Sequence, residues 1–138
     1  MPVIMKREKR LIPTYVPAAP NELPFFLEKK AYQGATGKVY PIPYTDRLSN
    51  EAVEKPYDMV TLENEYIQVE LLPELGGKIH GAVQKSNGYE FIYKNICIKP
   101  AMVGLAGPWV SGGVEFNWPQ HHRPTTFMPT EATLQENP

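Results

Sequence analysis

Cysteine is almost absent from the chain of 138 residues, in which Cys97 is the only one. A single thiol excludes an internal disulfide and a zinc site built from several cysteines, and it fits a reducing compartment. The flanking Ile96 and Ile98 predict that Cys97 is a small buried apolar side chain. Net charge is also close to zero, with 14 Lys and Arg against 15 Asp and Glu. Because no basic excess is present, we expect no nucleic-acid partner.

Long apolar runs are missing as well. Residues 1–10 are basic but lead into a stretch rich in proline, whereas a signal peptide needs an uninterrupted apolar segment. The least polar stretch, residues 100–113, is interrupted by Gly104, Gly107 and Pro108 and is shorter than the roughly 20 apolar residues of a membrane span. We therefore expect a cytoplasmic protein with no membrane partner.

The short motifs of common catalytic sites are also missing. The sequence contains no G-x-x-x-x-G-K-[ST], G-x-G-x-x-G, G-x-S-x-G or H-E-x-x-H. Glu115, His121 and His122 offer the ligands of a two-histidine, one-carboxylate metal site. Adjacent side chains of an extended segment point to opposite faces, however, so the two histidines make a poor chelating pair. We expect neither a metal nor a cofactor.

Proline, in contrast, is abundant, with 15 residues, about twice its average use. Four prolines near the N-terminus recur at short intervals: Pro13, Pro17, Pro20 and Pro24. They exclude a regular helix or a central strand over residues 11–24 and predict an extended N-terminal arm over residues 1–29. Residues 25–32 and residues 38–44 are typical of paired edge strands. A short helix is predicted between Ser49 or Asn50, which would cap it, and Pro56, which would end it.

Alternating polarity begins after Met59. Ile67, Val69 and Leu71 share one face of a predicted half-buried strand, with Gln68 and Glu70 on the other. A second strand follows over residues 78–83, in which His80 reads as a solvated or internally satisfied residue. Asn87-Gly88 favours a two-residue type I′ hairpin turn into a third strand over residues 89–93. These strands predict an antiparallel meander.

In the last third of the chain, residues 107–124 contain most of the polar and aromatic side chains that are candidates for a functional site: GPWVSGGVEFNWPQHHRP. As a strand, residues 114–118 would direct Val114, Phe116 and Trp118 into a core, and Glu115 and Asn117 toward a groove. The paired glycines 76–77 and 112–113 are typical of bends or bulges. A last strand is predicted over residues 131–135. A sheet that ends there has an open edge, which requires a cover or a partner.

Several side chains of this segment suit a sugar ligand. Trp109 can stack on the apolar face of a pyranose, and His121 and His122 can donate to a sugar oxygen or serve as a general acid. Arg123 can bond hydroxyls or a carboxylate, or form an ordinary surface ion pair.

Residues 107–128 resemble the signature block of the DUF5107 family, a bacterial domain of unknown function, and the resemblance extends from about residue 30 to the C-terminus. Members look like galactose-mutarotase-type proteins and often continue into tetratricopeptide repeats, which this chain lacks. The resemblance implies an all-β fold: an antiparallel β-sandwich over residues 30–138 that is the N-terminal part of a larger supersandwich. It also implies a sugar groove beside Glu115, Asn117, His121, His122 and Arg123.

Three functions follow from these features. The leading hypothesis is a carbohydrate-binding module, part of a larger carbohydrate-active protein, whose ligand contacts Trp109 and the residues of that groove. The second is an aldose 1-epimerase-like isomerase with His122 or His121 as the acid, although the superfamily's usual glutamate base lies in a later segment that this chain lacks. The third is a non-enzymatic module that forms homo-oligomers through open sheet edges.

Overall fold

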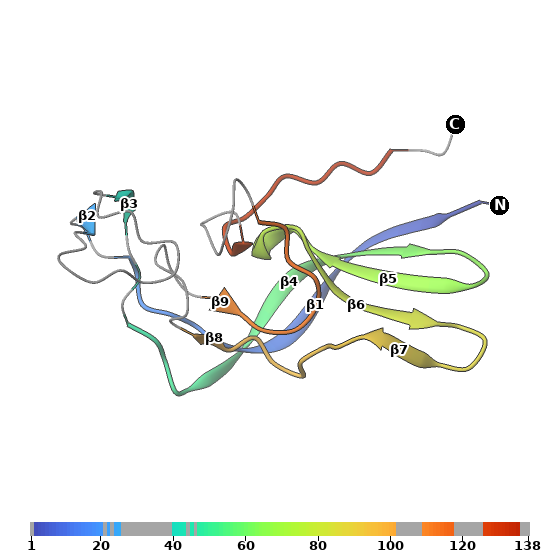
Figure 1. The fold of residues 1–138 in the computed structure, drawn as a ribbon, viewed down its shortest axis with the longest axis horizontal. Helices are drawn as coiled ribbons and strands as arrows, with labels where there is room; N and C mark the ends of the chain where they lie inside the picture. The colour runs from blue at the N-terminus through green and yellow to red at the C-terminus, as the bar shows by residue number, and fades with distance from the viewer. Residues whose placement is uncertain are drawn as a thin grey trace.

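The computed structural model describes residues 2–20, 22, 24–25, 40–43, 45, 47–101, 109–117 and 126–135. Its main element is a five-stranded antiparallel sheet in the order β1-β4-β5-β6-β7 (Figure 1). The strands are β1 (Ile4–Tyr15), β4 (Ala52–Glu63), β5 (Ile67–Leu72), β6 (Lys78–Gln84) and β7 (Tyr89–Ile92). The all-β, antiparallel fold class is thereby confirmed, and the sheet is consistent with part of a β-sandwich.

Two small two-stranded sheets and one 3-10 turn accompany the large sheet. The strands β2 (Pro24–Phe25) and β3 (Tyr40–Pro43) pair with each other, as do β8 (Pro100–Ala101) and β9 (Trp109–Val110). The pairing of β2 with β3 agrees with the edge strands predicted there. A 3-10 turn, η1 (Pro73–Leu75), connects β5 to β6.

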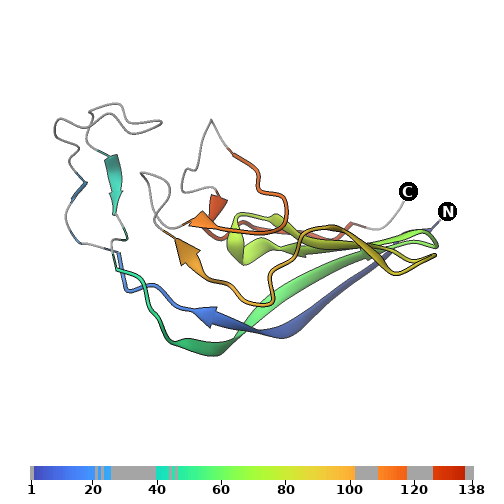
Figure 2. The ribbon, with the colours of Figure 1, turned by 60° about the horizontal axis from the view of Figure 1, so that its bottom comes forward.

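The N-terminal strand β1 pairs with β4 along its whole length of 12 residues, from Ile4 opposite Glu63 to Tyr15 opposite Ala52. Figure 2 shows the two strands curving together beyond the shorter strands. Thus residues 4–15 of the predicted arm are extended but belong to the sheet as its edge strand. Pro13 is tolerated because an edge strand needs hydrogen bonds on one side only. The predicted domain boundary after residue 29 lies outside the described residues and stays a prediction.

The helix predicted from Ser49 to Pro56 is wrong, because strand β4 begins at Ala52. The Ser49 hydroxyl accepts a hydrogen bond from the N–H of Glu51 at 3.0 Å, so the side chain closes a local turn instead of capping a helix. Pro56 lies opposite Leu11 in β1, whereas β5 pairs with β4 only from Val60 onward. On the side of β4 that faces β5, there is therefore no ladder at Pro56 for the missing N–H to interrupt. The strand continues through the proline.

The meander of β5, β6 and β7 agrees with the sequence, but its hairpin turn is wider than predicted. Residues 85–88 separate the paired Gln84 and Tyr89. The Asn87 side chain accepts from the N–H of Tyr89 at 3.0 Å, and Gly88, the single glycine of the loop, has a positive φ of 69°. The two-residue type I′ turn is thus replaced by a four-residue loop, closed by the N–H of Gly88 donating to the Gln84 carbonyl at 2.9 Å.

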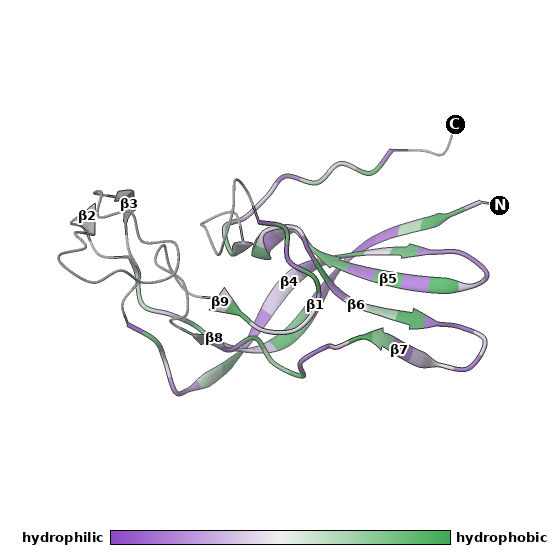
Figure 3. Cartoon of the chain, in the orientation of Figure 1, coloured by the Kyte–Doolittle hydropathy of each residue, from purple (hydrophilic) through white to green (hydrophobic). Residues whose placement is uncertain are grey.

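The buried face of the sheet is not the one that the apolar residues of β5 would suggest. Figure 3 shows hydrophobic and hydrophilic residues alternating along β5, which confirms the strand. Yet the buried residues of β5 are Glu70 and Leu72, while Ile67 is exposed. In β6, likewise, Lys78 and His80 are buried. We call the side that carries Glu70, Lys78 and His80 the polar face, and the side that carries Ile67 and Leu71 the apolar face.

The hydrophobic core also lies on the polar side of the sheet, at the end where β1 and β4 extend past β5. It consists of Ile12, Tyr57, Met59, Leu72, Ile98 and Val110. Ile98 is fixed by two backbone bonds to β1, with its N–H donating to Pro13 at 2.8 Å and its carbonyl accepting from Tyr15 at 2.9 Å. Its neighbour Cys97 is half-buried rather than buried.

On the apolar face, residues 131–135 do not form the predicted strand. They are held through the Arg7 guanidinium, which donates to the Ala132 carbonyl at 3.3 Å, and through Thr130, whose N–H donates to Pro73 at 2.9 Å. A cavity of about 440 Å³ remains between this segment and the sheet. Because the segment is held at two points rather than along a ladder, it does not close a sheet edge.

Candidate functional site

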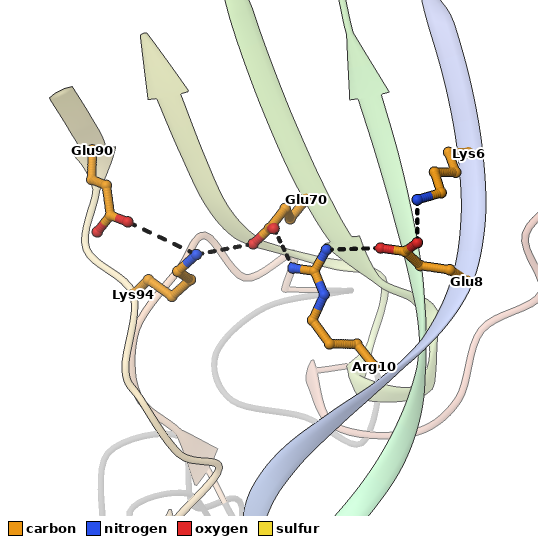
Figure 4. A network of polar contacts seen from close by, with 6 residues as sticks. All are labelled: Lys6, Glu8, Arg10, Glu70, Glu90 and Lys94. Atoms are coloured by element: carbon orange, nitrogen blue, oxygen red, sulfur yellow. Dashed lines mark hydrogen bonds and ion pairs between the residues drawn. The ribbon is translucent and has the colours of Figure 1, made fainter. Parts of the chain in front are cut away.

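A network of six charged side chains crosses the polar face, as Figure 4 shows: Lys6, Glu8, Arg10, Glu70, Glu90 and Lys94. Glu70 is at its centre, because it is bonded to the Arg10 guanidinium and accepts from the Lys94 ammonium at 3.1 Å. Arg10 also contacts Glu8 at 3.1 Å. Positive and negative groups thus alternate from strand β1 to the end of β7.

The Glu70 carboxylate is buried in this network and stays ionised. Burial alone would raise its pKa, but hydrogen bonds from Arg10 and Lys94 hold the pKa below its usual value. The Lys94 side chain reaches Glu70 by crossing Gly81, where a Cβ atom would stand 2.9 Å from the Lys94 Cδ. A side chain at position 81 would therefore require the Lys94 side chain to shift from its present path to Glu70.

His80 lies beside the network at a β-bulge. Glu70 is paired with Gly81 and Leu71 with Ile79, so His80 is the extra residue of β6. Its side chain is only 8% exposed, and no hydrogen bond to the imidazole is found within the described part of the chain. Burial lowers the pKa of His80 to about 4, against the opposing charge of Glu70. The imidazole is therefore neutral at neutral pH.

Lys78 connects the polar face to residues 109–117. Its side chain is 2% exposed, and its ammonium donates to the carbonyl of Val110 at 3.2 Å. Burial lowers the pKa of this ammonium, whereas the negative charge of Glu115 raises it. Lys78 thus lies under the segment that contains the candidate site residues Glu115 and Asn117. Its positive charge is opposed by the negative charge of Glu115.

Residues 111–114 run beside the first half of β6, in the place that β7 leaves free. Val114 and Ile79 exchange backbone hydrogen bonds of 2.9 and 3.0 Å, and the N–H of Gly113 donates to Tyr93 at 2.7 Å. The Asn95 amide donates to the carbonyl of Ser111 at 3.1 Å. The segment is therefore anchored at Ser111, Gly113 and Val114.

The strand predicted over residues 114–118 is wrong for its described part, because Val114 forms an isolated bridge and residues 115–117 form no ladder. Gly112 and Gly113, with φ of 83° and 70°, turn the chain just before the bridge. Val114 and Phe116 are 40% and 53% exposed, so their predicted place in a core is also wrong. Trp118 lies outside the described residues.

The structure brings Glu115 and Asn117 together. The Asn117 amide donates to the Glu115 carboxylate at 3.4 Å, with Asn117 exposed and Glu115 half-buried. Trp109, assigned by the sequence to a loop, instead begins β9 opposite Ala101 and is half-buried. His121, His122 and Arg123 lie outside the described residues, so their roles stay predictions.

Sequence reasoning missed the charged network and left His80 as either a solvated or an internally satisfied residue. The available signal was the polar alternation at Glu70, Lys78 and His80. In the described residues, no group of three His, Cys, Asp or Glu side chains is arranged to hold a metal ion. No helix among them has the length and apolar character needed to cross a membrane.

The chain is similar to a known protein family and to a solved structure. The family described as a domain of unknown function (DUF5107) matches residues 35–138. A crystal structure of a TPR-domain containing protein from Parabacteroides distasonis ATCC 8503 is similar, with a TM-score of 0.76 and 30% sequence identity. The similarity covers 92% of this chain and 21% of the solved one, so the chain spans about a fifth of that protein's length.

Proposed function

The chain belongs to the DUF5107 family, and from this premise we propose that it is a carbohydrate-binding module with a galactose-mutarotase-like site. The proposed ligand lies on the polar face, where residues 111–117 meet β6. One observation carries the proposal: Glu115 and Asn117 lie side by side on a segment anchored to the sheet, above the buried Lys78.

The chemistry of this pair suits a sugar. A carboxylate accepts hydrogen bonds, and a carboxamide both donates and accepts them, so together they complement the neighbouring hydroxyls of a pyranose. The Val114 bridge to Ile79 holds their backbone in place before a ligand arrives, which reduces the entropy lost on binding. Trp109 is a candidate for stacking against the ring, and His121, His122 and Arg123 complete the proposed site.

Isothermal titration calorimetry against a panel of neutral and acidic mono- and oligosaccharides tests the proposal. Asn117→Ala removes one hydrogen-bonding group, so we expect roughly tenfold weaker binding of any sugar that the wild-type chain binds. The matched control is Gln135→Ala, because Gln135 is an exposed carboxamide outside residues 111–117. Absence of binding to every sugar, or equal losses in both variants, would refute the proposal.

Self-association is a second candidate function, favoured by the two edges of the described sheet. Strand β7 pairs with β6 alone, and its Tyr89 and Phe91 are exposed. An uncovered edge offers unpaired backbone groups to a second copy of the chain. Light scattering across micromolar concentrations measures this directly, and a monomer at every concentration would exclude it.

A further inference from the structure

Among the described residues, His80 is the buried side chain of the polar face that no other role explains. It is more than nine-tenths buried, and within the described residues its imidazole has no hydrogen-bond partner. Buried polar groups are nearly always paired, and a group left unpaired in a native fold requires a reason. The bulge at His80 supplies one, because bulges redirect a side chain and occur next to binding sites.

Three of the four charged groups that act on His80 are paired with one another, and the fourth, Lys78, donates to the Val110 carbonyl at 3.2 Å and is opposed by the charge of Glu115. Arg10 and Lys94 both bond Glu70. At the two ends of the network, Glu8 pairs with Lys6 and Arg10, and Glu90 pairs with Lys94. An incoming carboxylate or phosphate would have to take Arg10 or Lys94 from Glu70, which would leave a buried carboxylate short of a partner. Otherwise it would have to approach Lys78 against the negative charge of Glu115.

We infer that His80 is a ligand-binding residue of the polar face and that it bonds a hydroxyl group of an uncharged sugar. A neutral imidazole has one N–H donor and one nitrogen acceptor, and a hydroxyl group can meet either of them. The inference rests on the proposed carbohydrate function and adds the ligand's charge and a contact residue that the sequence did not single out.

The first experiment compares matched sugars by calorimetry at neutral pH: methyl glucoside and methyl galactoside, the corresponding uronic acids, and the corresponding 6-phosphates. We expect the neutral glycosides to bind at least about tenfold more tightly than the acids or phosphates. Equal or tighter binding of an anionic sugar overturns the inference. If Asn117→Ala still weakens that anionic ligand, the proposed carbohydrate function stands and only the inference fails.

The second experiment tests His80 itself. His80→Phe keeps a planar ring but cannot form hydrogen bonds, and we expect roughly tenfold weaker binding of the neutral glycoside. His80→Gln keeps a donor and an acceptor and should lose less. In the wild-type chain, the ¹⁵N resonances of the His80 imidazole should shift when the neutral glycoside is added. These shifts remain measurable if either variant fails to fold.

The outcomes separate the two claims. Unchanged affinity in His80→Phe, or imidazole resonances that do not move on saturation with ligand, overturns the role of His80 while leaving the carbohydrate proposal in place. Absence of binding to all of the sugars overturns both.

Discussion

Gly113 lies against the main chain of β6, so closely that a Cβ atom there would stand 2.1 Å from the carbonyl oxygen of Ile79. The same carbonyl accepts the N–H of Val114 at 2.9 Å. Gly113 also has a φ of 70°, a conformation that L side chains rarely adopt. A residue without a side chain is therefore what allows residues 111–117 to reach the sheet and to place Glu115 next to Lys78.

Gly113→Ala should lower the free energy of unfolding by about 3 kcal/mol, because backbone strain and a clash with main-chain atoms add up. Urea denaturation measures the loss. Gly88→Ala is the matched control, since its φ is 69° but no atom lies within 4 Å of the added Cβ. That variant should lose only about 1 kcal/mol from backbone strain, and equal losses would show that the close approach to Ile79 is unimportant.

Ile98→Ala should lower the free energy of unfolding by about 2–4 kcal/mol, because it opens a cavity between β1 and the core. Ile98 is 3% exposed, whereas Ile96, two residues earlier, is 92% exposed. Ile96→Ala makes the same chemical change and should shift the unfolding free energy by less than about 0.5 kcal/mol. Thermal and urea denaturation compare the two. Similar effects in the two variants would contradict the placement of the core.

Glu70→Gln should destabilise the chain by about 3 kcal/mol, because it leaves the Arg10 and Lys94 cations without their shared carboxylate. Glu63→Gln is the control, since Glu63 pairs with Lys85 at the surface and such pairs contribute at most about 1 kcal/mol. A double-mutant cycle of Glu70→Gln with Lys94→Met isolates the coupling. A coupling energy near zero would mean that the pair at 3.1 Å adds nothing to stability.

The strands were predictable where local pattern and tertiary structure agree. The alternation of Ile67, Val69 and Leu71 predicted β5, and Asn87 with Gly88 predicted the hairpin, because period-2 polarity and turn residues act locally. Strand β4 was missed at its start because Ser49 and Pro56 favour a helix boundary in isolation. Twelve residues of pairing with β1 override that preference, and such pairing is not visible in a local window.

The buried face and the network were not predictable by the same reasoning. Alternation shows that Glu70 and Leu71 point to opposite sides, but it does not show which side is covered. The usual rule buries the apolar side, and here Glu70 is buried because Arg10, remote in sequence, reaches across from β1. Glu115 and Asn117 were identified from their spacing, yet their proximity comes from the Val114 bridge and not from a strand.

The stability of the chain should fall as the pH decreases from about 6.5 to about 4. The pKa of His80 is lowered from 6.5 in the unfolded chain to about 4 in the folded one. Between these values the unfolded chain binds a proton that the folded chain does not, so acid favours unfolding. The full shift corresponds to about 3 kcal/mol, present above pH 6.5 and lost on reaching pH 4.

Urea denaturation of the wild-type chain and of His80→Gln across this pH range measures the effect. Glu70 contributes a loss of the same sign, but only when the pH falls below the usual glutamate pKa of 4.5, because the pKa of Glu70 is lowered in the folded chain. The contributions of His80 and Glu70 to the loss of stability can therefore be distinguished between about pH 6.5 and about pH 5. In that interval His80 titrates in the unfolded chain, whereas Glu70 stays ionised in both states. Parallel pH profiles of the free energy of unfolding for the wild-type and variant chains over that interval would contradict the prediction. They would mean that the His80 imidazole takes up a proton in the folded chain despite its burial beside Lys78, Lys94 and Arg10.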